Sequence, residues 1–383
     1  MKNPKSNYQK PFFFISILII IISSIIILIK KMETKKKRQI PTLPKKLKIG
    51  YTNWGECDEK VFEAVKNGLN IIIWFSIDLT ENPITKECEI QRGLDYKKLA
   101  LMTKKFKDNN YKVINLISIG GWNSKHISEK FTAEEYYETF IKFNEKISNP
   151  SLDFYGFDGI DWDIEGHDDF SNSINHFTIK ELDLMGQLSV LLKKNNFIVS
   201  MAPSESYLDP FVEEFSLSLL FNHKEWEKEF PNFTYHGRNC YAYLIKKYGI
   251  DNFDFVSFQF YEGYSHALFK YEREKKFFGE ILIEFLNKVT NGFYVDFSSV
   301  EKTGLKREKI VIPQEKIVIG LANAWANGRF LFLPKKDIID SYKFVVENNF
   351  DIKGMMFWNI GDEDIVRDGE EFNMAKIFNE ILI

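Results

Sequence analysis

The sequence contains little of what disulfide-bonded miniproteins or fibrous proteins require. Its 383 residues include only three cysteines, Cys57, Cys88 and Cys240, so a framework of several disulfides is excluded. Three cysteines still allow one disulfide and one free thiol. The 11 prolines and 21 glycines are too few for a collagen. With 44% hydrophobic and 16% aromatic residues, the chain can instead fill a large folded core.

Motifs that bind nucleotides or metals are also absent. No G-x-G-x-x-G follows the first predicted strand, and the sequence has no P-loop, no H-E-x-x-H and no C-x-x-C. The six histidines show no metal-ligand spacing. We therefore expect no metal and no cofactor.

Acidic residues outnumber basic residues outside the N-terminal region. Residues 1–43 hold nine Lys or Arg and one acidic residue, which leaves 42 basic and 53 acidic residues, a net charge of -11, for the rest. Such a body is a poor partner for nucleic-acid phosphates. We expect a monomer that binds no nucleic acid.

A hydrophobic segment near the N-terminus divides the chain. The predicted parts are a basic tail (1–11), a hydrophobic segment (12–29), a basic tether (30–46) and a folded domain (47–383). Eighteen residues with nothing more polar than serine are long enough to span a membrane, and basic residues follow where a signal peptide would carry its cleavage site. This favours a membrane anchor over a cleaved secretory signal or a buried core helix. The folded domain would then lie outside the cell or in a lumen, although the heavier positive flank after the segment favours the opposite orientation.

Short apolar runs rich in β-branched residues alternate with segments of helical spacing throughout the folded domain. The eight runs begin near Leu47, Asn70, Lys112, Phe157, Phe197, Phe253, Lys316 and Lys353. The helical segments cover 59–66, 96–107, 133–146, 179–194, 271–288 and 336–348. This alternation predicts an α/β fold, a (β/α)8 TIM barrel whose longest loop insertions follow the fifth and sixth strands. A doubly wound open sheet is the alternative.

The fourth run, F-D-G-I-D-W-D-I-E from Phe157 to Glu165, carries an unusual row of acids. Because strand side chains alternate between faces, Asp161, Asp163 and Glu165 share one face, opposite the large apolar residues. In a barrel these acids would point inward, where carboxylates about 6.6 Å apart repel one another and at least one keeps its proton. Glu165 is the natural proton donor, because it lies at the C-terminal end of the strand, where barrel enzymes carry out their chemistry. Acids at a strand end can otherwise bind Ca²⁺ or Mg²⁺ or face solvent.

Three segments together resemble the glycoside hydrolases of family 18, the chitinase family. The run D-G-I-D-W-D-I-E from Asp158 to Glu165 is similar to the family signature D-x-x-D-x-D-x-E. One strand earlier, S-I-G-G-W from Ser118 to Trp122 resembles the S-x-G-G-W stretch, and Y-T-N-W from Tyr51 to Trp54 is similar to a run of animal-type members.

The resemblance implies a retaining mechanism in which the substrate itself assists, because this family departs from the usual pair of catalytic carboxylates. Glu165 would be the general acid and base, and the acetamido group of the sugar would be the nucleophile. Asp163 would orient and stabilise that group, and Asp161 would hold or share the proton of Asp163. Asp158 is out of phase with this row, so we expect it to be a structural acid.

The resemblance also implies the residues that surround the acids. Tyr261 would donate its hydroxyl to the acetamido oxygen, and Trp358 would form the floor under the sugar. Gln259 and Glu262 would contact substrate, although many relatives carry Met and Asp or Asn at these positions. Further candidates for lining the groove are Tyr51, Phe75, Gly121, Trp122 and Met201.

The function implied is that of an endo-acting chitinase whose partner is chitin or another N-acetylglucosamine-containing glycan. An endo-β-N-acetylglucosaminidase that cuts the chitobiose core of N-glycans is an alternative within the same family. A catalytically inactive chitin-binding lectin is an alternative from another class, but such proteins typically lose the acid that Glu165 provides.

Overall fold

The computed structural model describes residues 41–91, 93–169, 171–219, 237–263, 265–326, 330–367 and 369–383. The predicted tail, hydrophobic segment and most of the tether lie outside these residues. Within the described ranges, no helix has both the length and the apolar character needed to cross a membrane.

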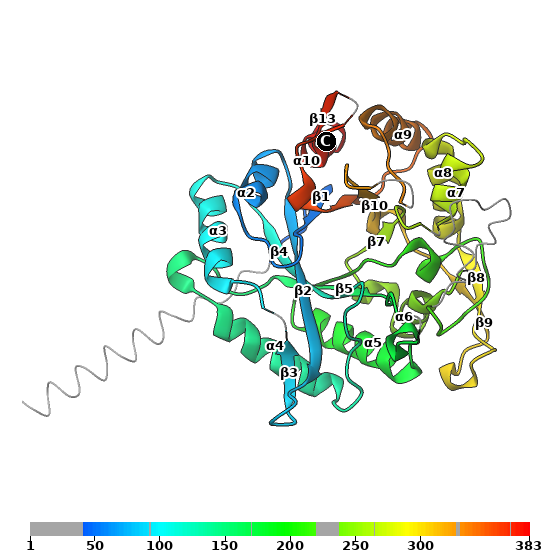
Figure 1. Cartoon of the computed structure of the whole chain (residues 1–383). Coiled ribbons are helices and arrows are strands. Elements are labelled where there is room, and N and C mark those ends of the chain that lie inside the picture. The colour runs from blue at the N-terminus through cyan, green and yellow to red at the C-terminus, as the bar shows by residue number, and fades with distance from the viewer. Residues whose placement is uncertain are drawn as a thin grey trace, which may run out of the picture. The chain divides into compact units, whose positions relative to one another are not determined.

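Eight parallel strands form a closed barrel, with helices between them (Figure 1). The strands are β1 (Leu47–Tyr51), β2 (Ile71–Glu81), β4 (Ile114–Gly121), β5 (Gly159–Ile164), β6 (Ile198–Met201), β7 (Phe255–Gln259), β10 (Ile317–Ala322) and β11 (Gly354–Trp358). The ring closes because β1 pairs with β11 on one side and with β2 on the other, so that Ile49 faces both Met356 and Ile71. The predicted (β/α)8 barrel is confirmed, and the open sheet is excluded.

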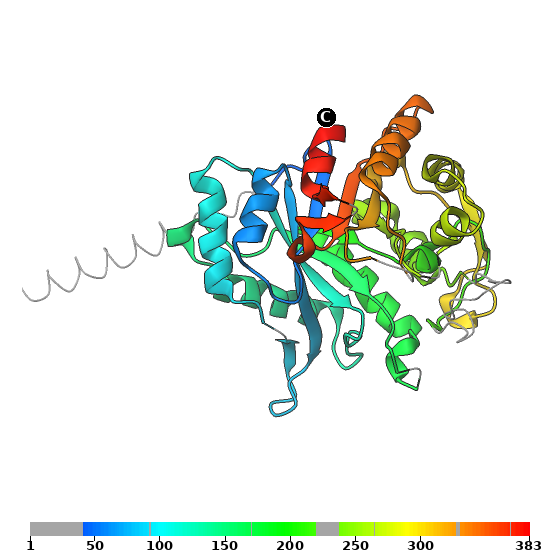
Figure 2. The same cartoon turned by 45° about the horizontal axis from the view of Figure 1, so that its top comes forward.

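Helices surround this ring in both views (Figures 1 and 2). They are α2 (Glu59–Lys66), α3 (Tyr96–Asp108), α4 (Ala133–Ile147), α5 (Ile179–Lys194), α6 (Cys240–Tyr248), α7 (His266–Glu272), α8 (Phe278–Asn291), α9 (Lys335–Glu347) and α10 (Met374–Ile381). Five of the six predicted helices agree with the structure to within one residue at each end. The single helix predicted over 271–288 is wrong, because the chain breaks between α7 and α8, where Lys275 takes the left-handed conformation (φ 54°) that a right-handed helix cannot contain.

Local signals explain where α4 and α5 begin. Each follows a threonine whose side chain accepts the N–H of a glutamate three residues later, Glu135 after Thr132 and Glu181 after Thr178. Each glutamate in turn accepts the backbone N–H of its threonine at 2.7 Å. This reciprocal cap satisfies N–H groups that a helix start leaves without partners, so both helices begin where the sequence predicts.

The insertions lie largely where the sequence predicts them. The connections after β6 and β7, the fifth and sixth barrel strands, are long, and the second holds the antiparallel pair β8 (Phe293–Asp296) and β9 (Arg307–Ile310). A further pair, β12 (Ile365–Arg367) and β13 (Glu370–Phe372), follows β11. The extended β2 pairs with β3 (Cys88–Gln91) in a hairpin that projects beyond the barrel (Figures 1 and 2).

Two hydrophobic layers fill the domain. The outer layer lies between the strands and the helices and includes Ile160, Trp162 and Ile164. Trp162 is fully buried there and donates its indole N–H to Ser189 Oγ on α5 at 2.8 Å. The inner layer fills the barrel interior with residues from opposite strands, such as Ile73 and Phe255. The alternation along β5 therefore leaves its acids on the inner side.

Candidate active site

The acids of β5 are buried inside the upper end of the barrel. Asp161, Asp163 and Glu165 are 0%, 3% and 7% exposed, so they do not face bulk solvent. Burial in a medium of low polarity disfavours the charged form of a carboxyl group. Each of the three therefore needs hydrogen bonds, a proton or both.

Asp161 is held by two hydroxyl groups from neighbouring parts of the ring. Tyr51 Oη donates to its Oδ2 and Ser200 Oγ to its Oδ1, both at 2.5 Å. Desolvation raises the pKa of Asp161 to about 6, although the two hydrogen bonds stabilise the carboxylate and oppose the increase. Asp161 is thus fixed in position at the bottom of the acidic row.

Asp163 lies between the other two acids. Gln259 Nε2 donates to its Oδ1 at 2.8 Å, and the same amide nitrogen donates to the Ala202 carbonyl at 2.7 Å. Desolvation and the charges of Glu165 and Asp161 raise its pKa well above the usual range for aspartate. Asp163 therefore binds a proton more tightly than an exposed aspartate does.

Glu165 follows the last residue of β5 and is the most exposed acid of the row. Desolvation, followed by the charge of Glu262, raises its pKa to about 8. Glu262 itself has a pKa raised to about 8 by desolvation and by the charge of Asp163. No described basic side chain contributes to the pKa of any of these groups. At neutral pH Glu165 can therefore hold a proton and release it to a basic atom placed beside it.

The two glycines at the end of β4 let other groups approach the backbone closely. Both have positive φ, 105° at Gly120 and 103° at Gly121. A Cβ on Gly120 would lie 2.6 Å from the Asp163 carbonyl oxygen, and one on Gly121 would lie 2.0 Å from Phe75 Cζ. Glycine is therefore needed here for the phenyl ring to pack on the strand end beside the acids.

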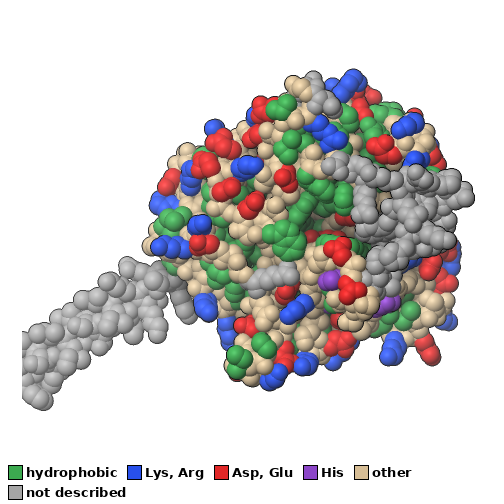
Figure 3. Space-filling model, in the orientation of Figure 1, with side chains coloured by type: hydrophobic (Ala, Val, Ile, Leu, Met, Phe, Trp, Pro, Cys, Tyr) green, Lys and Arg blue, Asp and Glu red, His purple; other side chains and the backbone are tan. Residues whose placement is uncertain are grey.

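Aromatic rings from several strand ends form a wall over the acids. Trp358 lies 5.9 Å from Tyr51 and 4.7 Å from Phe75 between ring centroids, and Phe75 in turn lies 4.6 Å from Trp54. Tyr261, two residues beyond the end of β7, is a member of the inner layer. In Figure 3 hydrophobic side chains gather around a hollow near the middle of the face, with acidic side chains beside them. Flat apolar rings at such a site can stack against a pyranose.

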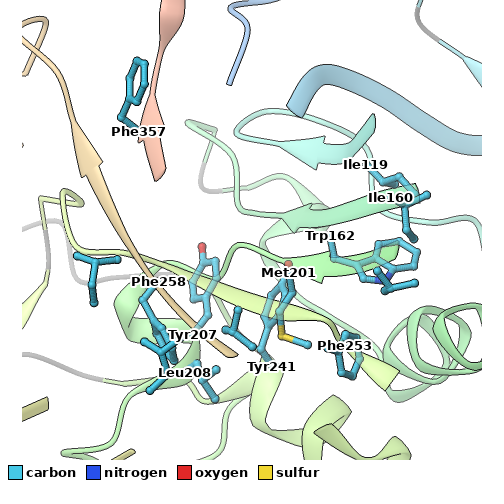
Figure 4. Close-up of a cluster of buried hydrophobic side chains, with 14 of the residues drawn as sticks. Ile119, Ile160, Trp162, Met201, Tyr207, Leu208, Tyr241, Phe253, Phe258 and Phe357 are labelled. Carbon is cyan, nitrogen blue, oxygen red and sulfur yellow. The ribbon is translucent and has the colours of Figure 1, made fainter. Parts of the chain in front are cut away.

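One candidate for the groove is placed elsewhere. Met201 is fully buried in the outer layer, with Trp162, Phe253 and Phe258 (Figure 4). The expectation that Met201 lines the groove is therefore wrong. The reason is strand alternation, because Ser200 is the residue of β6 that points inward and bonds Asp161.

Asp158 and Trp122 lie at opposite ends of the barrel. Asp158 precedes β5 and accepts the Asn115 N–H through its side chain at 2.9 Å, while its own carbonyl accepts the Ile198 N–H. It therefore joins β4 and β6 at the strand entrance. Trp122 follows β4, and its indole N–H donates to Asp168 Oδ1 at 3.0 Å, which fixes the ring above the strand ends.

Some residues of the site were not identified from the sequence. Ser200 could have been found by applying the alternation to β6. Trp54 lies in the Y-T-N-W motif and is 52% exposed beside Phe75. Trp325, on the loop after β10, lies 6.3 Å from Tyr261 and donates its indole N–H to the Trp358 carbonyl at 2.6 Å. No pattern in the sequence indicates that Trp325 reaches the site.

In the part of the chain that the structure describes, no three His, Cys, Asp or Glu side chains are grouped so that they could hold an ion. The arrangement can instead store and transfer protons through neighbouring carboxyl groups and bind a flat apolar ring above them.

Comparisons with known proteins give matches among solved structures. No model of a known protein family matches the sequence, and no curated protein matches it. The catalytic domain of a hyperthermophilic chitinase from Pyrococcus furiosus superposes with a TM-score of 0.52 at 12% identity, covering 89% of this chain and 96% of that one. The C-terminal domain of ChiA from Legionella pneumophila gives 0.50 at 15% identity over 82% and 92% of the two chains.

A fungal endo-β-N-acetylglucosaminidase from glycosyl hydrolase family 18 gives a TM-score of 0.49 at 13% identity, over 89% of this chain and 96% of that one. At these identities the likeness to the solved structures is one of fold. The two structures with TM-scores of 0.50 and above share the barrel fold that the sequence predicts.

Proposed function

We propose that this chain is a glycoside hydrolase of family 18, a chitinase that cuts β-1,4-linked N-acetylglucosamine polymers internally and with retention. The observation that carries the proposal is the buried row Asp161, Asp163 and Glu165, closed in by Gln259 and by aromatic rings. A proton kept on Glu165 near neutral pH suits a general acid.

The first step would break the glycosidic bond. Glu165 gives its proton to the glycosidic oxygen as the bond from that oxygen to the anomeric carbon breaks, so the leaving sugar departs as an alcohol. The acetamido carbonyl oxygen of the sugar on the non-reducing side attacks the anomeric carbon and forms an oxazolinium ion. Asp163 lies beside Glu165 and would accept a hydrogen bond from the acetamido N–H, which stabilises the positive charge that develops there.

The second step would hydrolyse the oxazolinium ion. Glu165, now ionised, takes a proton from water as the water oxygen attacks the anomeric carbon, and the acetamido oxygen leaves. Tyr261 would hold the acetamido oxygen in the attacking geometry. Tyr51 and Ser200 hold Asp161 beneath, so the row keeps its shape while protons move along it.

Product analysis tests this function. The purified protein is incubated with a short N-acetylglucosamine oligomer, with the same oligomer after removal of its N-acetyl groups, and with a high-mannose glycoprotein. We expect cleavage of the acetylated oligomer with the β-anomer released first, and no cleavage of the deacetylated one.

The other outcomes identify the alternatives. Release of glycans from the glycoprotein alone would indicate the endo-β-N-acetylglucosaminidase. Binding without turnover would indicate a lectin. Equal cleavage of the deacetylated oligomer would contradict substrate assistance.

We also propose that segment 12–29 anchors the domain in a membrane, with the barrel outside the cell or in a lumen. The support is its length and apolar composition. Fractionation of cells that express the full chain tests this: we expect the protein in the membrane fraction after a carbonate wash and sensitive to added protease only from the lumenal or external side. Recovery of a shortened soluble form would indicate a cleaved signal.

A further inference from the structure

The loop after β4 holds the segment that follows β5 by several hydrogen bonds. The Asn123 N–H donates to the Gly166 carbonyl at 3.0 Å. The Asn123 side chain also exchanges two bonds with Asp168, at 2.7 and 2.9 Å. These side-chain bonds lie at the exposed rim of the contact. A deeper contact is made by a residue that the sequence did not single out, His126.

His126 is buried and touches the backbone of the proposed general acid. Its Nε2 lies 3.0 Å from the carbonyl oxygen of Glu165. A carbonyl can only accept a hydrogen bond, so Nε2 carries a hydrogen and donates it. The Glu165 carbonyl lies just beyond the end of β5, and this bond replaces the strand pairing that it would otherwise have.

The imidazole is itself fixed from two other directions. Its ring stacks on Phe177 at a centroid distance of 4.6 Å and an interplanar angle of 29°. Its Nδ1 is buried, has no hydrogen-bond partner among the residues that the structure describes, and lies 3.6 Å from Oε2 of Glu181, which takes part in the cap of α5. The ring is thus packed between the start of α5 and the strand end, with little freedom to leave the Glu165 carbonyl.

The residue before Glu165 is held on the opposite side by α6. Tyr241 Oη accepts the Ile164 N–H at 2.8 Å and lies 3.1 Å from the Ile164 carbonyl, to which it donates. The strand β6 ends at Met201, so this hydroxyl replaces a partner strand at Ile164. The two peptide groups that carry the Glu165 side chain are therefore fixed by Tyr241 and by His126.

We propose that His126 is a positioning residue for Glu165, which holds the peptide of the general acid so that its carboxyl group meets the glycosidic oxygen. The inference rests on the proposed function. A displacement of a reacting group by about 1 Å can lower a rate by about 100-fold. His126 lies behind the backbone, so substrate affinity does not depend on it.

Two replacements of His126 test this role, one that lacks a hydrogen-bond donor and one that keeps a donor. H126F keeps the stacking on Phe177 but cannot donate, whereas H126Q can place an amide N–H near the position of the imidazole Nε2. We expect H126F to lower kcat on an N-acetylglucosamine oligomer by about 10- to 100-fold, with KM changed less than about twofold, and H126Q to restore most of the loss.

A matched control lies in the same loop. N123G removes the exposed side-chain bonds to Asp168, and glycine tolerates the left-handed backbone at this position, where φ is 64°. We expect N123G to keep the wild-type kcat. An N123G variant as impaired as H126F would overturn the assignment to His126, as would a wild-type kcat in H126F or an H126Q variant no better than H126F.

Thermal unfolding of each variant shows whether it is folded. If H126F does not fold, H126M replaces it, because a flexible side chain without a donor can fill the same space. If the wild-type protein cleaves no N-acetylglucosamine substrate, the proposed function itself fails, an outcome that no His126 variant can imitate.

Discussion

The acids at the two ends of the barrel have different neighbours. At the N-terminal end, Asp254 lies 2.7 Å from Lys193, and Asp351 lies 2.6 Å from Lys46. At the C-terminal end, Asp161, Asp163 and Glu165 have other acids, hydroxyl groups and an amide as neighbours. The pKa of Asp351 is lowered by Lys46, whereas burial raises the pKa of Glu165 to about 8.

The difference distinguishes acids that are paired with a lysine and join segments of the chain from the acids of the row on β5. A carboxylate paired with a lysine stays ionised and joins two segments of the chain, as Asp351 does next to β11. A carboxyl group that is buried without a counter-charge has a raised pKa, which lies closer to neutral pH, so it can both bind and release a proton there. Carboxyl groups buried without a described basic partner occur at the end of the barrel where the aromatic wall also lies.

The largest expected effect comes from removing the exchangeable proton at Glu165. We expect E165Q to lower kcat by about 100- to 10,000-fold, since general acid–base catalysis contributes that much. The measurement is the initial rate of product release from an N-acetylglucosamine oligomer. E363Q is a matched control, because Glu363 is also buried with a pKa raised to about 8 but caps α10 through the Met374 N–H.

Turnover by E165Q at the wild-type rate would contradict the role of Glu165 as the proton donor. An E363Q variant as strongly impaired as E165Q would show that the loss does not depend on the position of the acid in the row. Far-UV circular dichroism of both variants shows whether the fold is kept.

A change in pH is expected to have an intermediate effect on activity and on the free energy of unfolding. The general acid must be protonated, so activity should persist to about pH 8, the pKa of Glu165, and decrease above it. For stability, the pKa in the folded state is raised above its usual value of 4.5, so the folded protein binds the proton more tightly. The contribution of this group to the free energy of unfolding is therefore fully present below about pH 4.5 and is lost as pH rises towards 8.

Urea denaturation at pH 5 and pH 8 measures this dependence. We expect a smaller decrease between the two pH values for E165Q than for the wild type, because glutamine does not titrate. Identical decreases would show that Glu165 titrates alike in the folded and unfolded states.

The smallest effect is expected at the other end of the barrel. D351N removes the ion pair with Lys46, but Asp351 is 71% exposed and Lys46 still donates to the Ile352 carbonyl. We expect the free energy of unfolding to decrease by no more than about 1 kcal/mol, as for other exposed pairs, and kcat to stay the same. A twofold or greater loss of kcat would show that the two ends are coupled.

Much of the fold could be predicted from local patterns. Short apolar runs rich in β-branched residues located the eight strands, and segments of helical spacing located five of the six predicted helices. The break between α7 and α8 was missed, because it depends on the left-handed backbone of one lysine, a residue type that does not signal this conformation.

The candidate site was predicted less completely. Alternation along β6 turns Ser200 inward and Met201 towards the helices, which contradicts the expectation that Met201 lines the groove. Trp325 and His126 approach the site from loops whose paths no periodic pattern encodes.

The sequence by itself determined that three acids share one face of a strand, because the direction of neighbouring side chains is a property of the local backbone. The tertiary structure alone decided that this face is buried, that Tyr51 reaches Asp161 across 110 positions of the chain and that no described lysine or arginine neutralises the row. Desolvation and hydrogen bonding depend on groups brought together from distant segments, so the proton on Glu165 is a property of the folded barrel.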